Sequence, residues 1–244
     1  AAWSNSASLF ILTTANGANL PAGASETNFP VLVRFNANNF NFSQARTNGA
    51  DIRFEAAGGA ALSYQIEQWD TTSGTASVWV RIPLIQGNTN QQIKMYWGKA
   101  DAASESSGSA VFNATNGYAC VMHLSDPVSP LKDEVGNLSP TDYGTTATTG
   151  MMGKGRHFVL GQGVDCGQNI TNFPTGTGPH STEVWLRPQN GRNGNRTLVW
   201  GQGQPGSVVQ IMLASSPPLT LWVDCYYSGG SVSGTTGINL SQWV

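Results

Sequence analysis

The sequence predicts an all-β protein made of two antiparallel β-sandwiches in tandem, and three observations lead to this fold class. Apolar and polar residues alternate in three runs, at residues 62–67, 78–82 and 93–97, with the period of strands that bury one face. Turn-forming residues separate these runs, so neighbouring strands are expected to run antiparallel. Only 11% of the 244 residues are charged and 29 are glycine, a composition typical of short strands joined by many turns.

Two further strands are predicted before the alternating runs, at residues 8–12 and 29–35. Pro30 stands at the start of the second of these strands, where its missing N–H costs little. Residues 40–45 are expected to form one short helical turn. The segment 99–110 is small and polar, and we expect a short helix at its beginning.

The pattern restarts after residue 112, so the predicted domains are residues 1–112 and 113–244. In the second domain, residues 118–124 are predicted to form a buried strand and residues 125–153 a long polar loop. Short strands separated by Gly, Pro and Asn turns follow at residues 157–160, 182–187, 197–200, 208–213 and 219–223. This spacing is typical of a sandwich.

The final residues, Trp243 and Val244, read as the start of a strand that no later segment can pair with. An uncovered sandwich edge is an aggregation hazard. We therefore expect either a longer chain that completes the second sandwich, or self-association in which another copy covers this edge.

Composition also bounds the partners and the location of the protein. The net charge is −2 with no basic block, so nucleic-acid binding has no electrostatic basis. No apolar run reaches the roughly 18 residues that a membrane span needs. The chain begins Ala1-Ala2-Trp3 without Met, as a processed secreted chain does, so we expect a secreted or cell-surface protein.

The chain has three cysteines, Cys120, Cys166 and Cys225, and no pair has the spacing of a metal site. One interpretation is that all three are small buried residues. The alternative is a Cys166–Cys225 disulfide within the second domain, in an oxidising compartment.

Five segments of the first domain occur in an order that resembles a bacterial extracellular domain of unknown function. Members of that family precede lectin-like domains, and some occur in proteins associated with MotA/TolQ/ExbB-type proton channels. The segments that carry the resemblance are residues 29–34, 49–54, 62–67 with Trp69, 78–80 and 95–98.

The second domain resembles the concanavalin-A-like, laminin-G-like lectin and glucanase superfamily. The resemblance rests on His123-Leu124, residues 133–137, 153–155 and 183–187, and the terminal Trp243. It implies a jelly-roll sandwich that often binds glycans or proteins, although a fold does not fix a function. In that superfamily further strands follow the last Trp, so the resemblance implies that C-terminal strands are missing here.

A glucanase of this superfamily carries two carboxylates on one strand, about 5–5.5 Å apart in retaining enzymes. Here Glu183 is followed at i+2 and i+4 by Trp185 and Arg187, so the pair is lacking. No G-x-S-x-G elbow accompanies the three histidines, which are interpreted as structural or surface side chains: His123, His157 and His180. We therefore predict that the chain is not an enzyme.

Acidic residues concentrate in and after the long loop of the second domain, among them Glu134 and Asp142. Calcium takes six to eight oxygen ligands from carboxylates and carbonyls on loops. We predict calcium as the possible cofactor, held by Asp126, Asp133 and Asp165; the alternative is that these are solvated loop acids.

Glycan binding needs flat aromatic faces flanked by amides and carboxylates. Two surfaces are candidates. The first consists of Trp69 with Glu67 and Asp70, and Trp97 at a strand end is a further candidate. The second consists of Trp222, Asp224 and Tyr226, which share one strand face. The alternative is that these aromatic residues are core.

The sequence thus predicts a non-catalytic extracellular binding module, with a polysaccharide, a cell-surface glycan or a surface protein as its partner. The alternative is a structural adhesin, fibre or envelope subunit that self-assembles through sandwich edges.

Overall fold

The computed structural model describes residues 2–127, 129–167, 179–189, 196–202, 208–213, 220–226, 230–234, 237–239 and 241–244, and for strands between residues 196 and 233 the backbone alone. The chain forms two compact units, residues 1–173 and 174–244. The predicted boundary after residue 112 falls inside the first unit. The described residues form antiparallel sheets with one short α-helix, which confirms the all-β prediction.

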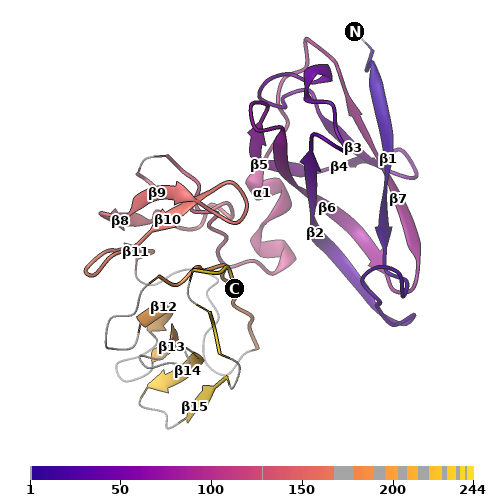
Figure 1. The fold of residues 1–244 in the computed structure, drawn as a ribbon. Helices are drawn as coiled ribbons and strands as arrows, with labels where there is room; N and C mark the ends of the chain where they lie inside the picture. The colour runs from indigo at the N-terminus through magenta and orange to yellow at the C-terminus, as the bar shows by residue number, and fades with distance from the viewer. Residues whose placement is uncertain are drawn as a thin grey trace. The chain divides into compact units, whose positions relative to one another are not determined.

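The first unit begins with seven strands in two sheets (Figure 1). Sheet I has the strand order β1-β7-β3-β4, and sheet II has the order β2-β6-β5. The strands are β1 (Asn5–Leu12), β2 (Ser25–Asn36), β3 (Arg53–Ala56), β4 (Ala61–Leu62), β5 (Tyr64–Asp70), β6 (Thr75–Gln86) and β7 (Asn90–Trp97).

The two sheets share one hydrophobic core, which makes the arrangement sandwich-like. Phe54 and Met95 of sheet I are 1% exposed, and Val78 and Val80 of sheet II are fully buried. These residues occupy alternate positions of their strands, so the intervening side chains point away from the core. Burial of each such side chain contributes about 1.5–3 kcal/mol.

The structure confirms the strands predicted in the first domain. The ranges 8–12, 29–35, 78–82 and 93–97 lie within β1, β2, β6 and β7, and 62–67 is divided between β4 and β5. The predicted helical turn is the 3-10 helix η1 (Phe42–Gln44), which the Asn41 side chain caps by accepting a hydrogen bond from the Ser43 N–H. Sequence analysis does not predict β3, because four residues are too few to display a period.

A β-bulge interrupts β5. Ile66 lies opposite Val78, and Trp69 lies opposite Ala76, so one extra residue is inserted between Ile66 and Gln68. The bulge reverses the alternation, and Trp69 packs against the core beside Ile66 instead of facing outward. Glu67 stays on the outer face of sheet II.

The helix expected at the beginning of residues 99–110 is wrong. The α-helix α1 (Gly108–Val111) forms at the end of this segment, where the Ser107 side chain caps it. The residues before it pair with the free edge of β5 instead: Ser107 N–H donates to the Tyr64 carbonyl over 2.9 Å, and Ile66 N–H donates to Ser106 Oγ over 2.8 Å. These bonds satisfy edge groups that would otherwise lack partners.

The strand predicted at residues 118–124 is wrong. After the short 3-10 helix η2 (Ala114–Asn116) the chain is irregular, and the rings of Tyr118 and His123 pack against Phe112, with His123 also stacked on Trp79 of sheet II. Two small two-stranded sheets begin in the predicted loop and extend beyond its end at residue 153, and their strands show no clear period in the sequence. They pair β8 (Thr141–Tyr143) with β11 (Gly163–Asp165), and β9 (Thr146–Thr149) with β10 (Lys154–His157).

The strand predicted at residues 157–160 meets β10 only at His157. The next three residues, Phe158, Val159 and Leu160, are apolar but exposed, and Leu160 is 80% accessible. The apolar run at residues 158–160 therefore predicts a strand where the chain forms a loop.

The second unit contains a four-stranded antiparallel meander in sequence order. The strands are β12 (Arg196–Gln202), β13 (Val208–Leu213), β14 (Leu221–Tyr226) and β15 (Gly230–Ser233). The first three confirm the predictions at residues 197–200, 208–213 and 219–223. The jelly roll stays a prediction.

The segment 182–187 forms no strand, but it has a partner. Leu186 and Val244 exchange two backbone hydrogen bonds, each 2.9 Å long. Val244 therefore pairs with a segment earlier in the chain, and the expectation of further C-terminal strands stays a prediction.

Candidate functional site

A buried polar cluster lies on the outer face of sheet II. The bulge and the strand alternation place Gln65, Glu67 and Trp79 on this face, and His123 of the irregular segment covers them. Trp79 Nε1 donates to Glu67 Oε2 over 2.6 Å, His123 Nδ1 lies 3.5 Å from the same oxygen, and His123 Nε2 lies 3.0 Å from Gln65 Oε1. The side chains of Glu67 and His123 are 3% and 9% exposed.

Aromatic rings close this cluster against water. The rings of Trp79 and His123 stack with an interplanar angle of 13°, and Phe112 meets both edge-on at 5.6 and 5.7 Å. Tyr118 in turn packs against Phe112 at 5.3 Å. Such contacts stabilise a pair beyond the area they bury, so the cluster ties residues 112–123 to sheet II.

Burial sets the protonation of the central pair. Desolvation raises the pKa of Glu67 to about 7, and nearby Glu134 adds to the rise, although the Trp79 hydrogen bond opposes it. Desolvation also lowers the pKa of His123, against the field of Glu134. Both shifts favour the neutral forms of Glu67 and His123.

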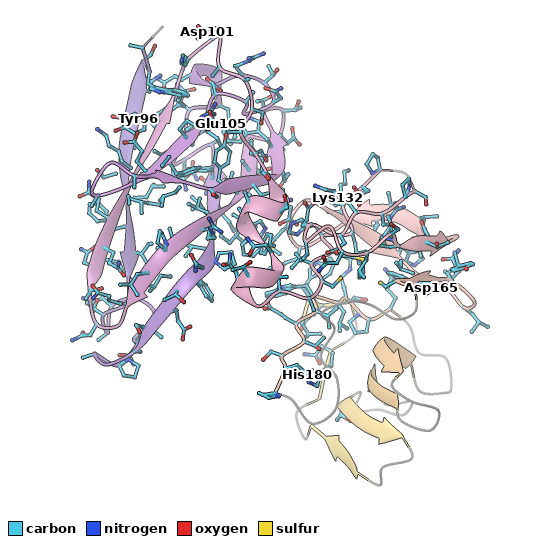
Figure 2. The ribbon with its side chains drawn as sticks, turned by 180° about the vertical axis from the view of Figure 1, so that it is seen from behind. Tyr96, Asp101, Glu105, Lys132, Asp165 and His180 are labelled. Carbon is cyan, nitrogen blue, oxygen red and sulfur yellow. The ribbon has the colours of Figure 1, made fainter. Side chains whose placement is uncertain are left out.

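Beside this cluster opens a depression of about 480 Å³, which we call the polar depression. Among the side chains that line it are Gln65, Ser106, Ser107, Ser109, Lys132 and Glu134. They come from β5, from the segment that covers its edge together with the start of α1, and from the loop after the irregular segment. Figure 1 shows α1 beside β5, and Figure 2 labels Lys132 next to this helix.

An ion pair lies at the rim of the polar depression. Lys132 Nζ is 2.5 Å from Glu134 Oε2, and the lysine side chain is 58% exposed whereas that of Glu134 is 9% exposed. The ammonium group therefore stays available to solvent while it neutralises the buried carboxylate. The depression offers an amide, hydroxyls, an ammonium and a carboxylate, which are donors and acceptors for a hydroxyl-rich ligand.

Of the tryptophans predicted for ligand binding in the first domain, Trp97 lies in the core and Trp69 packs against it. Trp69 and Trp97 join an aromatic cluster, in which Phe40 lies 5.6 Å from Trp69 and 5.2 Å from Trp97 between ring centroids. Trp97 is 9% exposed. Trp69 is partly buried against the same core. These contacts favour the core alternative, and a ligand-binding role of the two rings stays a prediction.

Glu67 and Asp70 do not converge with these rings. Glu67 is buried on the opposite face of the strand from Trp69, because of the bulge. Asp70 caps its own turn by accepting hydrogen bonds from the N–H groups of Thr72 and Ser73, over 2.8 and 3.1 Å. Bonds from the side chain and backbone of Ser73 lower the pKa of Asp70.

The second predicted surface lies in β14. Trp222, Asp224 and Tyr226 occupy alternate positions of this strand, as the sequence predicts for one face. Their side chains lie outside the described structure, so this surface stays a prediction.

The three predicted calcium ligands have other partners. Asp133 is 3% exposed, and its carboxylate accepts hydrogen bonds from the N–H groups of four residues: Val121, Val135, Asn137 and Leu138. Asp126 accepts from the Lys132 N–H, and Asp165 accepts from the Gly167 N–H. In the part of the chain that the structure describes, no three His, Cys, Asp or Glu residues are grouped to hold a metal. Calcium binding stays a prediction.

Sequence analysis missed the polar depression because its residues come from three distant segments. The side chains of β5 that face away from the core could have indicated this site. Gln65 and Glu67 are polar, and the structure buries both side chains. A polar residue that faces away from the core of a two-layer sandwich is normally solvated, so only the covering segment reveals their role. His123 is structural, as interpreted, but it also holds the amide of Gln65 in place.

Comparison with known families finds a domain of unknown function, DUF2341, at residues 48–119. This match confirms that a domain of unknown function lies in the first part of the chain, and it runs from just before β3 to just after η2. It includes Gln65, Glu67 and Trp79 and the serines of the polar depression. No curated protein and no solved structure matches the chain. The described residues include no helix that is long and apolar enough to cross a membrane.

Proposed function

We propose that this chain is a non-catalytic extracellular binding module for a polysaccharide or cell-surface glycan, and that the polar depression receives the ligand. The single observation that carries the proposal is the convergence of Gln65, the serines at 106, 107 and 109, and the Lys132–Glu134 pair on one depression of about 480 Å³. That volume lies in the range of small-ligand sites, about 300–1,000 Å³.

The chemistry of the lining suits a neutral, hydroxyl-rich ligand. Sugar hydroxyls donate and accept at once, and the lining supplies both kinds of partner. The charges of Lys132 and Glu134 offset each other, and the carboxylates of Asp126 and Asp133 at the same depression accept hydrogen bonds from backbone N–H groups. The amide of Gln65 is preoriented because its oxygen is bonded to His123, which leaves its NH₂ group as a donor.

The carboxylates at the polar depression support binding rather than hydrolysis. Glycoside hydrolysis needs one carboxyl that gives a proton and another that attacks or activates water. Glu134 is paired with Lys132, Asp133 is surrounded by backbone N–H donors, and Asp126 accepts from the backbone of Lys132. Each group is committed to an internal partner.

Retention of the purified chain on a panel of insoluble polysaccharides tests the proposal. We expect retention on at least one polysaccharide, and loss of retention by about tenfold in Lys132→Ala and in Ser109→Trp, which fills the polar depression. Lys154→Ala, on an exposed lysine of β10, is the matched control and should bind like the unmodified chain. No retention on any polysaccharide, or full retention of Ser109→Trp, contradicts the proposal.

The free edge of sheet I supports a second candidate function, self-assembly. Among the described strands, β1 pairs with β7 alone, and its outward side chains Phe10 and Leu12 are 57% and 41% exposed. An edge strand with exposed apolar side chains is a template for pairing with another chain. Sedimentation over a range of concentrations tests this candidate: oligomers that Phe10→Lys abolishes would favour it, and a monomer at all concentrations would exclude it.

A further inference from the structure

The edge of sheet I at β1 differs from the other strand edges of sheets I and II. In sheet II, the segment before α1 covers the edge of β5. The other edge strand of that sheet, β2, contains Pro30, the charged residues Glu26 and Arg34, and Asn28 with a φ of +53°, which are features that hinder pairing with another chain. In sheet I, β4 has only two residues. In contrast, β1 has eight residues and contains no charge, no proline and no left-handed residue.

The core is also incompletely covered at β1. Its inward side chains Leu9 and Ile11 pack against the core but are only partly buried, whereas Ile93 and Met95 of the neighbouring β7 are 4% and 1% exposed. Figure 1 shows β1 beside β7 at the margin of the sheet. On the outer face, Phe10 is 57% exposed. A strand added to β1 would therefore pair its open backbone groups and bury apolar side chains on both faces.

The stretch of β1 that is open to pairing runs from residue 5 to residue 11. The next residue, Leu12, is already committed, because its carbonyl accepts a hydrogen bond from the Ala18 N–H over 2.9 Å. The centre of the open stretch is Ser8, on the outer face. Since the stretch carries no charge, two copies of it can meet without repulsion.

We propose that β1 pairs with β1 of a second copy of this chain, antiparallel and about a two-fold axis at Ser8, so that two copies of sheet I form one continuous sheet. Ser8 then lies opposite its equivalent on the outer face, and Ala7 lies opposite Leu9 of the partner subunit on the core side. The same stretch serves both copies, so the contact closes at a dimer. The proposal rests on the second candidate function, self-assembly, for which it names the partner strand.

Sedimentation of the full chain over a range of concentrations, without any ligand, tests the proposal with two charge variants. Ser8→Lys and Ser8→Glu each bring two like charges together at the two-fold axis, so we expect each to weaken dimer formation by about tenfold or more. An equal mixture of the two variants brings opposite charges together and should restore the dimer. Restoration is specific to the proposed pairing, because only a two-fold axis at this position joins residue 8 of both copies.

Phe29→Lys is the matched control, because Phe29 is a 46% exposed phenylalanine on β2, the other long edge strand. It should dimerise like the unmodified chain, whereas Phe10→Lys should stay a monomer. The proposal is overturned by a monomeric unmodified chain, or by Ser8 variants with native circular dichroism whose mixture stays monomeric. Dimers that persist in each Ser8 variant alone would also overturn it, although self-assembly through another surface would then stand. Retention on polysaccharides is measured separately and does not enter these outcomes.

Discussion

The carboxyl group of Glu67 links stability to pH. Its pKa in the folded chain is about 7, against 4.5 for the free side chain, so the folded state binds this proton more tightly than the unfolded state does. The stability that protonation contributes is complete below about pH 4.5 and is lost as the pH rises to about 7. The full effect is about 3 kcal/mol, because each unit of pKa difference corresponds to about 1.4 kcal/mol.

Glu67→Gln removes this dependence while it keeps an acceptor for Trp79. We expect the variant to gain stability relative to the unmodified chain as the pH rises from about 5 to about 8, measured by urea unfolding. His123 acts in the opposite sense, because its lowered pKa destabilises the fold below about pH 6.5, but it is present in both proteins. A difference between the two chains that is constant with pH would contradict the assignment.

Gly49 is required by the same rearrangement that buries Trp69. Its φ is +66°, and a Cβ there would lie 2.7 Å from Trp69 Cδ2. We expect Gly49→Ala to lower the free energy of unfolding by about 2–3 kcal/mol. Gly59→Ala is the control, because Gly59 also has a positive φ of +83° but has open space around it. Equal losses in the two variants would show that Trp69 does not press on Gly49.

At the residue scale, the sequence shows where the aromatic and acidic residues are. It does not show on which face of the strand a bulge places them. Strict alternation places Glu67 and Trp69 on one face, and a single inserted residue separates them. Neither bulge position is Gly or Pro, so the sequence carries no mark of the irregularity.

The covering segment before α1 protects the edge of β5. Ser106→Ala would leave the Ile66 N–H without its partner, and we expect a loss of about 1–2 kcal/mol together with faster hydrogen exchange at Ile66. Ser104→Ala is the control. The Ser104 side chain is exposed, and its Oγ accepts only a 3.3 Å hydrogen bond from the Ser106 N–H. Unchanged exchange at Ile66 in Ser106→Ala would mean that the edge is protected by other contacts.

Elements were predictable where two sheets impose a period on the sequence. In β6 and β7 core-facing and outward residues alternate over most of the strand, so their places follow from the pattern. Residues 118–124 show the limit of this argument, because their apolar run predicts a strand and yet the chain is irregular there. The strand β8 and the Thr-rich strand β9 are short and mostly exposed, and they leave no period to detect.

For the whole molecule, the sequence predicted the all-β class but not the extent of the first unit. The chain from residue 113 onward reads as a new domain because the strand pattern restarts there. The structure joins it to sheet II through His123 and Phe112, whose contacts appear only after folding. The polar depression exists because of this joining.

Backbone amide NMR of the chain, titrated with a soluble oligosaccharide of the polysaccharide it binds, tests the central claim most directly. The account predicts chemical-shift changes concentrated at Ser106 to Ser109 and at Gly136, which line the polar depression. Changes concentrated instead on the outer face of sheet I around Tyr96, or no change at saturating oligosaccharide, would contradict it.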